Sequence, residues 1–156
     1  MANLNFISSR AMSFVKIWVH VVFATKNREP FLTREIRYQV KNKIIQDCKD
    51  QEIYLQSING YRDHLHCLIS LGREQTISYV VQQIKGGSSN WLNEKHFENG
   101  EFLWQDDYFA ISVSESQVQQ VINYIKNQER HHATHSFEDE VEELNKKFGI
   151  KAIKDI

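Results

Sequence analysis

The chain has 156 residues with a net charge of −1, 41% hydrophobic residues and 25% charged residues, which is typical of an ordinary globular domain. One proline and six glycines leave no room for a low-complexity linker. No stretch approaches the roughly 20 apolar residues that span a bilayer, so a membrane protein is excluded. Two cysteines are too few for a disulfide framework, and a cytoplasmic location is predicted.

The small net charge conceals a gradient along the chain. Residues 1–50 carry nine Lys and Arg against four Asp and Glu, whereas residues 101–156 carry six against eleven. A polyanion such as DNA would therefore meet the first third of the chain rather than its C-terminal part.

Residues 1–12 are polar and lack periodicity, so we expect a loose extension there, then a single domain over 13–150 and a tail over 151–156. Alternating apolar residues predict a first strand from Phe14 to Thr25. A helix is predicted from an N-cap at Thr33 to about Asp50. Its expected buried stripe is Ile36, Val40, Ile44 and Ile45.

A second strand over 52–59 and a turn over 60–63 lead into the apolar run from Asp63 to Leu71. Side chains alternate along a strand, which places His64 and His66 on one face of the sheet and Cys67 on the other. Two imidazoles on one face form half of a metal site. Taken alone, the spacing fits two histidines on a solvent-exposed face equally well.

The second half of the chain continues the pattern. A helix is predicted after Thr76, a last strand region over 102–104 and 108–113, and a charged helix over 137–148. The order β-α-β-β-α-β predicts an α+β, ferredoxin-like or RRM-like split βαβ fold: an antiparallel sheet with helices on one face and extra C-terminal helices. The other face, with the histidine pair, is expected to be free for chemistry.

A third helix is predicted to begin at Ser114, which forms a capping box with Gln117. Tyr124 and Gln128 lie one turn apart on the edge of its apolar stripe. Either residue alone is best explained as packing or as a solvated side chain. Beside a sheet face with two histidines, the pair becomes a candidate nucleophile and third metal ligand.

Three motifs follow one another at characteristic spacing: Asp63-His64-Leu65-His66, Ile84-Lys85-Gly86, and the run from Tyr124 to His132. Together they resemble the single-tyrosine HUH transposases of the insertion-sequence 200/605 type, and the likeness extends over about 13–150. The chain departs from the family pattern at Gly60-Tyr61-Arg62, where an apolar lead-in is expected, and at Asp106-Asp107.

The resemblance implies that His64 and His66 bind a divalent metal, that Gln128 completes the protein ligands, and that Tyr124 is the nucleophile. Mg²⁺ or Mn²⁺ is the expected ion, because zinc sites more often recruit a cysteine or a third histidine. The pair His131-His132 is interpreted as a partner of a helix C-terminus or as a DNA contact.

The implied substrate is single-stranded or hairpin DNA, and the implied assembly is a homodimer in which Tyr124 acts within its own chain or on its partner. Lys26, Arg28 and Lys85 are candidates for contacts to the DNA backbone, with ordinary solvated charges as the alternative. No membrane partner is expected.

These features predict a DNA transposase that cleaves and rejoins single-stranded DNA through a covalent 5′-phosphotyrosine. The alternative is a domesticated hairpin-binding protein that no longer cuts. An unrelated His-x-His metalloenzyme fits poorly. Cupin-like sites need a glutamate soon after the pair, where Ser70 and Leu71 stand, and an amidohydrolase barrel needs roughly 250 residues.

Overall fold

The computed structural model describes residues 13–148, so the predicted extension over 1–12 and tail over 151–156 lie outside the described residues. The sheet consists of β1 (Ile17–Ala24), β2 (Tyr54–Gly60), β3 (His64–Leu71) and β4 (Phe109–Val113). Its spatial order is β2-β3-β1-β4, and every neighbouring pair is antiparallel. The predicted split βαβ fold is confirmed.

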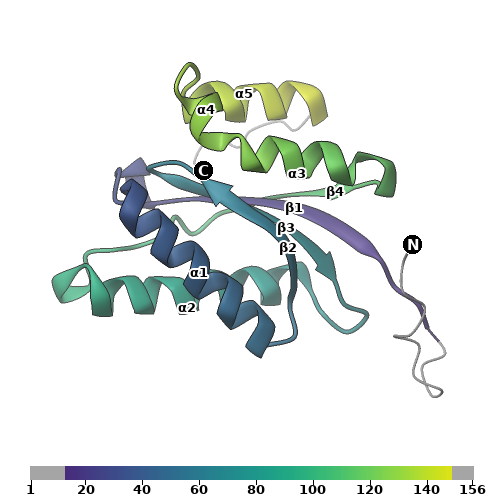
Figure 1. Ribbon diagram of the computed structural model, residues 1–156, viewed down its shortest axis with the longest axis horizontal. Helices are drawn as coiled ribbons and strands as arrows, with labels where there is room; N and C mark the ends of the chain where they lie inside the picture. The colour runs from purple at the N-terminus through teal and green to yellow at the C-terminus, as the bar shows by residue number, and fades with distance from the viewer. Residues whose placement is uncertain (1–12, 149–156) are drawn as a thin grey trace.

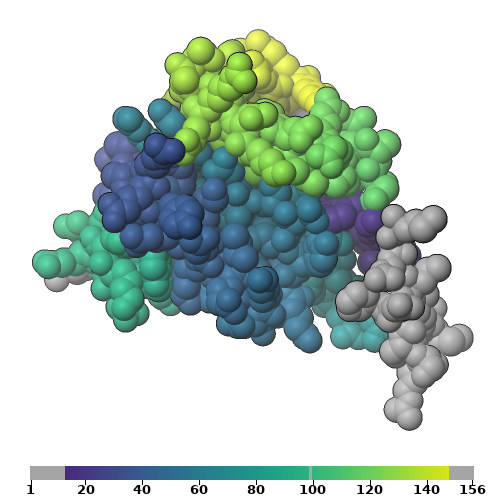
Figure 2. All heavy atoms as spheres, in the orientation of Figure 1, coloured from purple at the N-terminus to yellow at the C-terminus, as the bar shows by residue number. Residues whose placement is uncertain are grey.

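Helices cover both faces of this sheet. On one face lie α1 (Arg34–Asp50) and α2 (Ile77–Lys95), and across the other lie α3 (Val118–Lys126), α4 (Gln128–His132) and α5 (Phe137–Phe148) (Figure 1). In the space-filling view these three C-terminal helices, coloured green to yellow, form a continuous layer over the strands (Figure 2). The expectation that the second face is free is therefore wrong.

The main core lies between the sheet and the pair α1 and α2. Alternate residues of β1, including Val21 and Phe23, point into it. On α1 the predicted N-cap is confirmed, because the Thr33 side chain accepts a hydrogen bond from the N–H of Ile36. The buried stripe of α1 differs from the prediction, since Ile45 is exposed. Its members are Arg37, Val40, Ile44 and Cys48.

Two smaller apolar clusters explain why the second face is covered. Trp18 and Leu68 lie against Ile122 and Ile125 of α3. At the other end of the same face, Val22, Ala24 and Phe109 pack against Phe137 of α5. Because these strand residues are apolar, leaving them in water would cost free energy, and the C-terminal helices remove them from it.

The entry to α3 also differs from the prediction. The Ser114 side chain makes no capping bond, and its Oγ lies 3.2 Å from Ser116 Oγ. A short 3-10 turn over Glu115–Gln117 precedes α3, which begins at Val118. Residues 102–104 form no strand, and Trp104 makes only an isolated bridge to Thr25. Within 13–148 no helix has the length and apolar character needed to cross a membrane.

The β2–β3 hairpin brings two backbones unusually close at Gly60. A Cβ placed on Gly60 would lie 2.1 Å from the carbonyl oxygen of His64, so only glycine fits there. Tyr61 then donates its N–H to the same carbonyl over 3.0 Å. The tight hairpin therefore fixes the backbone of His64, at the start of β3.

Candidate active site

The two histidines of β3 lie on the face covered by the C-terminal helices. His64 and His66 are fully buried, and their ring centroids are 5.1 Å apart. His20 on β1 is buried beside them, and its Nε2 lies 2.9 Å from His66 Nδ1. The predicted shared face is confirmed by the strand register, which places His66 opposite Val22. The solvent-exposed interpretation of these histidines is wrong.

The predicted partners of the histidines come from the junction of α3 and α4. Tyr124 lies near the end of α3, and Gln128 begins α4 after a turn residue, Asn127. The chain keeps helical spacing across this turn, because Asn127 donates its N–H to the Asn123 carbonyl and its own carbonyl accepts from His131. Gln128 Oε1 lies 3.2 Å from His64 Nε2. Both residues therefore reach the histidine pair.

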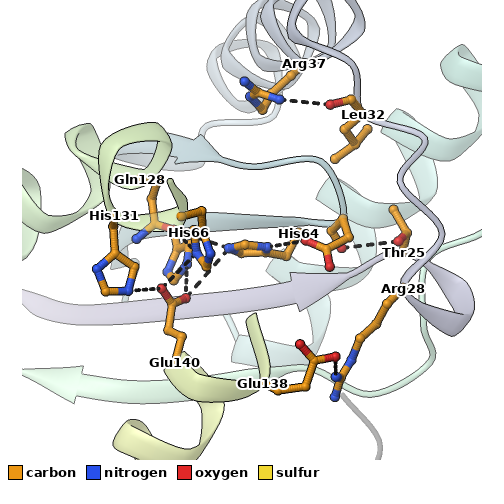
Figure 3. Close-up of polar contacts among 12 residues, drawn as sticks. Thr25, Arg28, Leu32, Arg37, His64, His66, Gln128, His131, Glu138 and Glu140 are labelled. Atoms are coloured by element: carbon orange, nitrogen blue, oxygen red, sulfur yellow. Dashed lines mark hydrogen bonds and ion pairs between the residues drawn. The ribbon is translucent and has the colours of Figure 1, made fainter. Parts of the chain in front are cut away.

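Two further residues, missed by the sequence analysis, complete the cluster. His132 comes from the end of α4 and Glu140 from α5, and both are buried. The ligand-type atoms of His64, His66, His132 and Glu140 all lie within 4.8 Å of one another. Figure 3 shows the carboxylate of Glu140 pointing up into the histidines, from the opposite side to Gln128. The sequence suggests only a helix-dipole or DNA-contact role for His132, and its place in this cluster is an addition from the structure.

Two cluster histidines are oriented by acceptors on their outer nitrogens. Asp63 Oδ1 lies 2.7 Å from His64 Nδ1, and the carbonyl oxygen of His135 lies 2.9 Å from His132 Nδ1. Each Nδ1 therefore carries a hydrogen, and in the neutral ring each Nε2 presents a lone pair to the cluster. Metal-binding histidines are held in this way.

The atoms that these lone pairs face are acceptors as well. Gln128 Oε1 lies 3.0 Å from His132 Nε2, and Glu140 Oε2 lies 3.1 Å from the same nitrogen. Acceptors that face one another repel unless a proton or a cation lies between them. In the described part of the chain, His66 Nε2 and Glu140 Oε1 are buried without a hydrogen-bond partner, although they are 2.6 Å apart. Three imidazoles, a carboxylate and an amide oxygen fit a divalent cation.

The charges within the cluster also favour a bound cation. Burial raises the pKa of Glu140, but the adjoining rings of His132 and His66 outweigh that effect, and the net pKa is well below its usual range. Burial lowers the pKa of His132, yet the hydrogen bond and the charge of Glu140 raise it overall. Burial, followed by the charge of His66, lowers the pKa of His20 to about 3, so that this ring is neutral. The carboxylate is thus ionised and demands a positive partner.

Tyr124 lies half-buried at the edge of this cluster and in the same chain. Its ring centroid is 5.6 Å from those of His66 and His131, both edge-on. Burial, and then the negative charge of Glu140, raise the pKa of the phenol above its usual range. With α5 packed against the site, the phenol of Tyr124 is therefore protonated.

The first turn of α5 closes the site. Phe137 stacks on the His64 ring with centroids 4.2 Å apart and is 3% exposed. Glu138, in the same turn, forms an ion pair with Arg28, a predicted DNA contact (Figure 3). An acidic helix thus occupies both the cluster and a predicted phosphate contact.

The other predicted DNA contacts lie apart from the cluster. Lys26 is half-buried in the loop after β1, and its N–H donates to the Leu103 carbonyl. Lys85 lies on α2, on the opposite side of the sheet, and its ammonium donates to the carbonyls of Gln105 and Asp106 over 2.5 and 2.9 Å. The roles of these residues in DNA binding stay predictions.

The fold and the cluster together define a class of protein: a split βαβ domain with a metal-type site on one sheet face and a tyrosine beside it. Residues 13–128 match the family described as "Transposase IS200 like". The chain belongs to this family of transposases and is therefore related to DNA-processing enzymes.

Two relatives illustrate the match. The ISDra2 transposase TnpA of Deinococcus radiodurans is 29% identical over 117 residues, which cover 70% of this chain and 81% of that protein. The transposase of insertion sequence IS200 from Salmonella typhimurium is 27% identical over 115 residues, covering 70% of this chain and 74% of the relative. Both alignments span most of each relative.

Two solved structures share the fold. A crystal structure of a protein assigned as a transposase, from Deinococcus radiodurans, superposes with a TM-score of 0.62 at 23% identity, covering 78% of this chain and 98% of that one. A REP-associated tyrosine transposase bound to a REP hairpin superposes with a TM-score of 0.56 at 19% identity, covering 81% of this chain and 74% of that one. The family match ends at Gln128, so α5 lies beyond it.

Proposed function

We propose that this transposase cleaves and rejoins single-stranded, hairpin-containing DNA through a covalent 5′-phosphotyrosine on Tyr124. The observation that supports this most directly is the placement of the phenol beside inward-facing imidazole nitrogens of the same chain, with ring centroids of Tyr124 and His66 5.6 Å apart. Hairpin DNA is proposed because a structural relative was solved on a REP hairpin.

In this proposal His64, His66 and Gln128 hold the metal, and His132 and Glu140 are additional donors when α5 is docked. A bound divalent cation would polarise the scissile phosphate and stabilise the charge on the departing oxygen. His132 supplies the third histidine that zinc sites often recruit, so Zn²⁺ joins the candidate ions. A site rich in imidazole favours Mn²⁺ or Zn²⁺ over Mg²⁺, which prefers oxygen ligands.

The chemical step belongs to Tyr124. Its Oη forms a bond to the phosphorus, the bond from phosphorus to the 3′ oxygen breaks, and the phenol proton passes to water while the 3′ oxygen takes up a proton. The phosphotyrosine ester conserves the energy of the broken linkage. A second 3′-hydroxyl can therefore attack the ester, release the phenol and rejoin DNA without a nucleotide cofactor.

DNA can reach this site only if α5 moves. Phe137 covers His64 and Glu140 fills the centre of the cluster, so a phosphate and the carboxylate cannot occupy that position together. Departure of Glu140 would also remove a charge that raises the pKa of Tyr124. The docked helix thus keeps both the cluster and the nucleophile inactive in this proposal.

The test is a covalent adduct on a denaturing gel. A hairpin-bearing oligonucleotide is labelled at its 3′ end, because the fragment on that side of the break stays on the tyrosine, and is incubated with the protein and Mn²⁺. We expect an adduct that disappears with a chelator and with Tyr124→Phe, but not with Tyr38→Phe, which removes an exposed hydroxyl on α1. An adduct that survives Tyr124→Phe, or that retains only a 5′ label, contradicts the proposal.

The covered site favours one alternative, a hairpin-binding protein that does not cut. It predicts tight binding of the oligonucleotide without an adduct, even when α5 has been loosened by substitution at Phe137. Binding together with an adduct in that variant excludes it.

A further inference from the structure

A cavity of about 520 Å³ lies beside the metal-type cluster but outside it. Its walls come from the start of α1, from the turn between β2 and β3 and from α4, and they include Arg34, Arg37, Tyr61, Arg62 and Glu129. This volume falls within the range of small-molecule and cofactor sites. The chemistry proposed for Tyr124 and the metal-type cluster does not use these side chains.

The cavity is strongly basic. Three of the lining residues are arginines, and Glu129 is the single carboxylate among them. Arg37 is fixed at the base: its side chain is 5% exposed, and it donates to the Leu32 carbonyl over 2.9 Å and to Glu129 Oε1 over 2.6 Å. Arg34 and Arg62 are exposed at the mouth. The cavity therefore combines a rigid cation inside with two reachable cations outside.

An aromatic ring separates this cavity from the cluster. Tyr61 stacks on His132 with centroids 5.4 Å apart and an interplanar angle of 17°. The guanidinium carbons of Arg37 and Arg62 lie 5.6 and 5.7 Å from the centroid of the same tyrosine ring. A ligand in the cavity would therefore lie one stacked pair of rings away from the proposed site of strand cleavage.

The sequence supports a dedicated role for this wall. Tyr61 and Arg62 belong to the Gly60-Tyr61-Arg62 segment, in which the chain departs from the apolar lead-in expected by resemblance. Gly60 and the hairpin hold this segment in register directly before His64. Tyr61 and Arg62 are thus held by the same hairpin that fixes the backbone of His64.

We propose that this cavity, the arginine pocket, binds one nucleotide of the single strand next to the cleaved phosphate. Phosphate oxygens would be held by Arg34 and Arg62 at the mouth, since guanidinium groups bind phosphate through paired hydrogen bonds. The base would enter beside Tyr61 and its guanidinium neighbours, which offer planar surfaces for stacking. The proposal rests on the strand-transfer function proposed above and names the part of its substrate that lies beside the cluster.

The experiment measures DNA binding rather than cleavage, so that it stands apart from the test of Tyr124. A fluorescent single-stranded oligonucleotide is titrated with the full-length protein in a chelator, over a series of salt concentrations. The test variant is Arg34→Gln/Arg62→Gln, in which both side chains are exposed in the free protein. The matched control is Arg73→Gln, an exposed arginine beyond the opposite end of β3.

Each lost phosphate contact to a single strand reduces the slope of log K against log salt by about 0.7, which corresponds to about 5-fold in affinity at 0.1 M salt. We therefore expect the double variant to lose about 25-fold in affinity and about 1.4 in slope. The control should bind like the unaltered chain. An unchanged slope in the double variant, or an equal loss in Arg73→Gln, overturns the proposal.

A competition arm separates a strand from a free nucleotide. Thymidine monophosphate is added to the complex of the unaltered protein with the oligonucleotide. Weak competition supports a nucleotide bound as part of a strand, whereas displacement at concentrations near the oligonucleotide's own Kd overturns the strand assignment. A normal Tyr124 adduct with unaltered binding by the double variant rejects the arginine pocket alone. Weakened binding by the double variant, together with no adduct from the unaltered protein, rejects the strand-transfer chemistry alone.

Discussion

Replacing Phe137 with alanine tests whether helix α5 competes with DNA. The Phe137 side chain is 3% exposed, stacks on His64 and lies under the Arg28 guanidinium, whose carbon is 5.4 Å from the ring centroid. Truncating a buried phenylalanine to alanine costs about 3–5 kcal/mol. Because Phe137 packs on the second face and not in the core against α1 and α2, this loss should fall mainly on the docking of α5.

The expected effect on DNA binding follows from population arithmetic. A ligand that needs the open state binds with an affinity reduced by the open fraction, and each 1.4 kcal/mol changes that fraction tenfold. Weakening the docked state by about 3 kcal/mol should therefore tighten binding of a single-stranded hairpin by up to about 100-fold. The yield of the covalent adduct should rise as well.

The assay is anisotropy of a labelled hairpin oligonucleotide, followed by the adduct gel. Phe31→Ala is the matched control, since it removes a partly buried phenylalanine from the core on the other side of the sheet. The control should lower stability without tightening DNA binding. Unchanged or weaker DNA binding by a folded Phe137→Ala protein would refute the competition between α5 and DNA.

Three further outcomes are expected. Mn²⁺ or Zn²⁺ at 100 times its Kd should stabilise the fold by about 2.7 kcal/mol, which raises Tm by about 5–10 °C. In His132→Ala the metal should raise Tm in a thermal melt by only about 1 °C. A full increase in Tm in this variant would show that His132 is not a ligand. Gly60→Ala should lower the free energy of unfolding in urea by about 1–3 kcal/mol, because its Cβ would collide with the His64 carbonyl; a change below about 0.5 kcal/mol would contradict this reasoning. Burial raises the pKa of Cys48 to about 11 and raises that of Cys67 further. Neither thiol of the folded protein should therefore react with a disulfide reagent at pH 8. Rapid labelling of the folded protein would contradict their burial.

The sheet and the helices that flank its core were predictable because their periodicities are strong. The strand β1 and the cap at Thr33 are both present in the structure. On α1 the prediction of Ile45 as a buried residue is wrong. Ile44 and Ile45 are adjacent and both apolar, so the sequence allows either to face the core, and tertiary contacts bury Ile44.

The covered face was missed although the sequence carried a signal for it. Leu68 follows His64 and His66 on the same face of β3, and Val22 lies opposite His66 on β1. These apolar side chains require a cover that neither α1 nor α2 can provide. The polar histidines favour an open face, whereas the apolar residues interleaved with them favour a covered one.

Glu140 and His132 were harder to predict because their positions depend on tertiary contacts. Glu140 stands three residues after Phe137 and one before Val141, within the apolar stripe of α5, and a carboxylate in such a stripe is a signal of a buried partner. The partner itself comes from another helix and could not be read from spacing. By contrast, the turn at Asn127 preserved the spacing of Tyr124 and Gln128, and both reach the cluster as the pattern predicted.

The phenol of Tyr124 and the imidazoles that it faces belong to one polypeptide, which determines whether two inactive variants can complement each other in a mixed dimer. If each subunit is self-sufficient, mixing inactive Tyr124→Phe chains with inactive His64→Ala chains cannot restore strand transfer, since every subunit lacks one of its two essential groups. An exchange of helices between subunits would instead give one repaired centre per heterodimer. Complementation in mixed assemblies would thus reveal whether the contact between Tyr124 and His66 within one chain is the working arrangement.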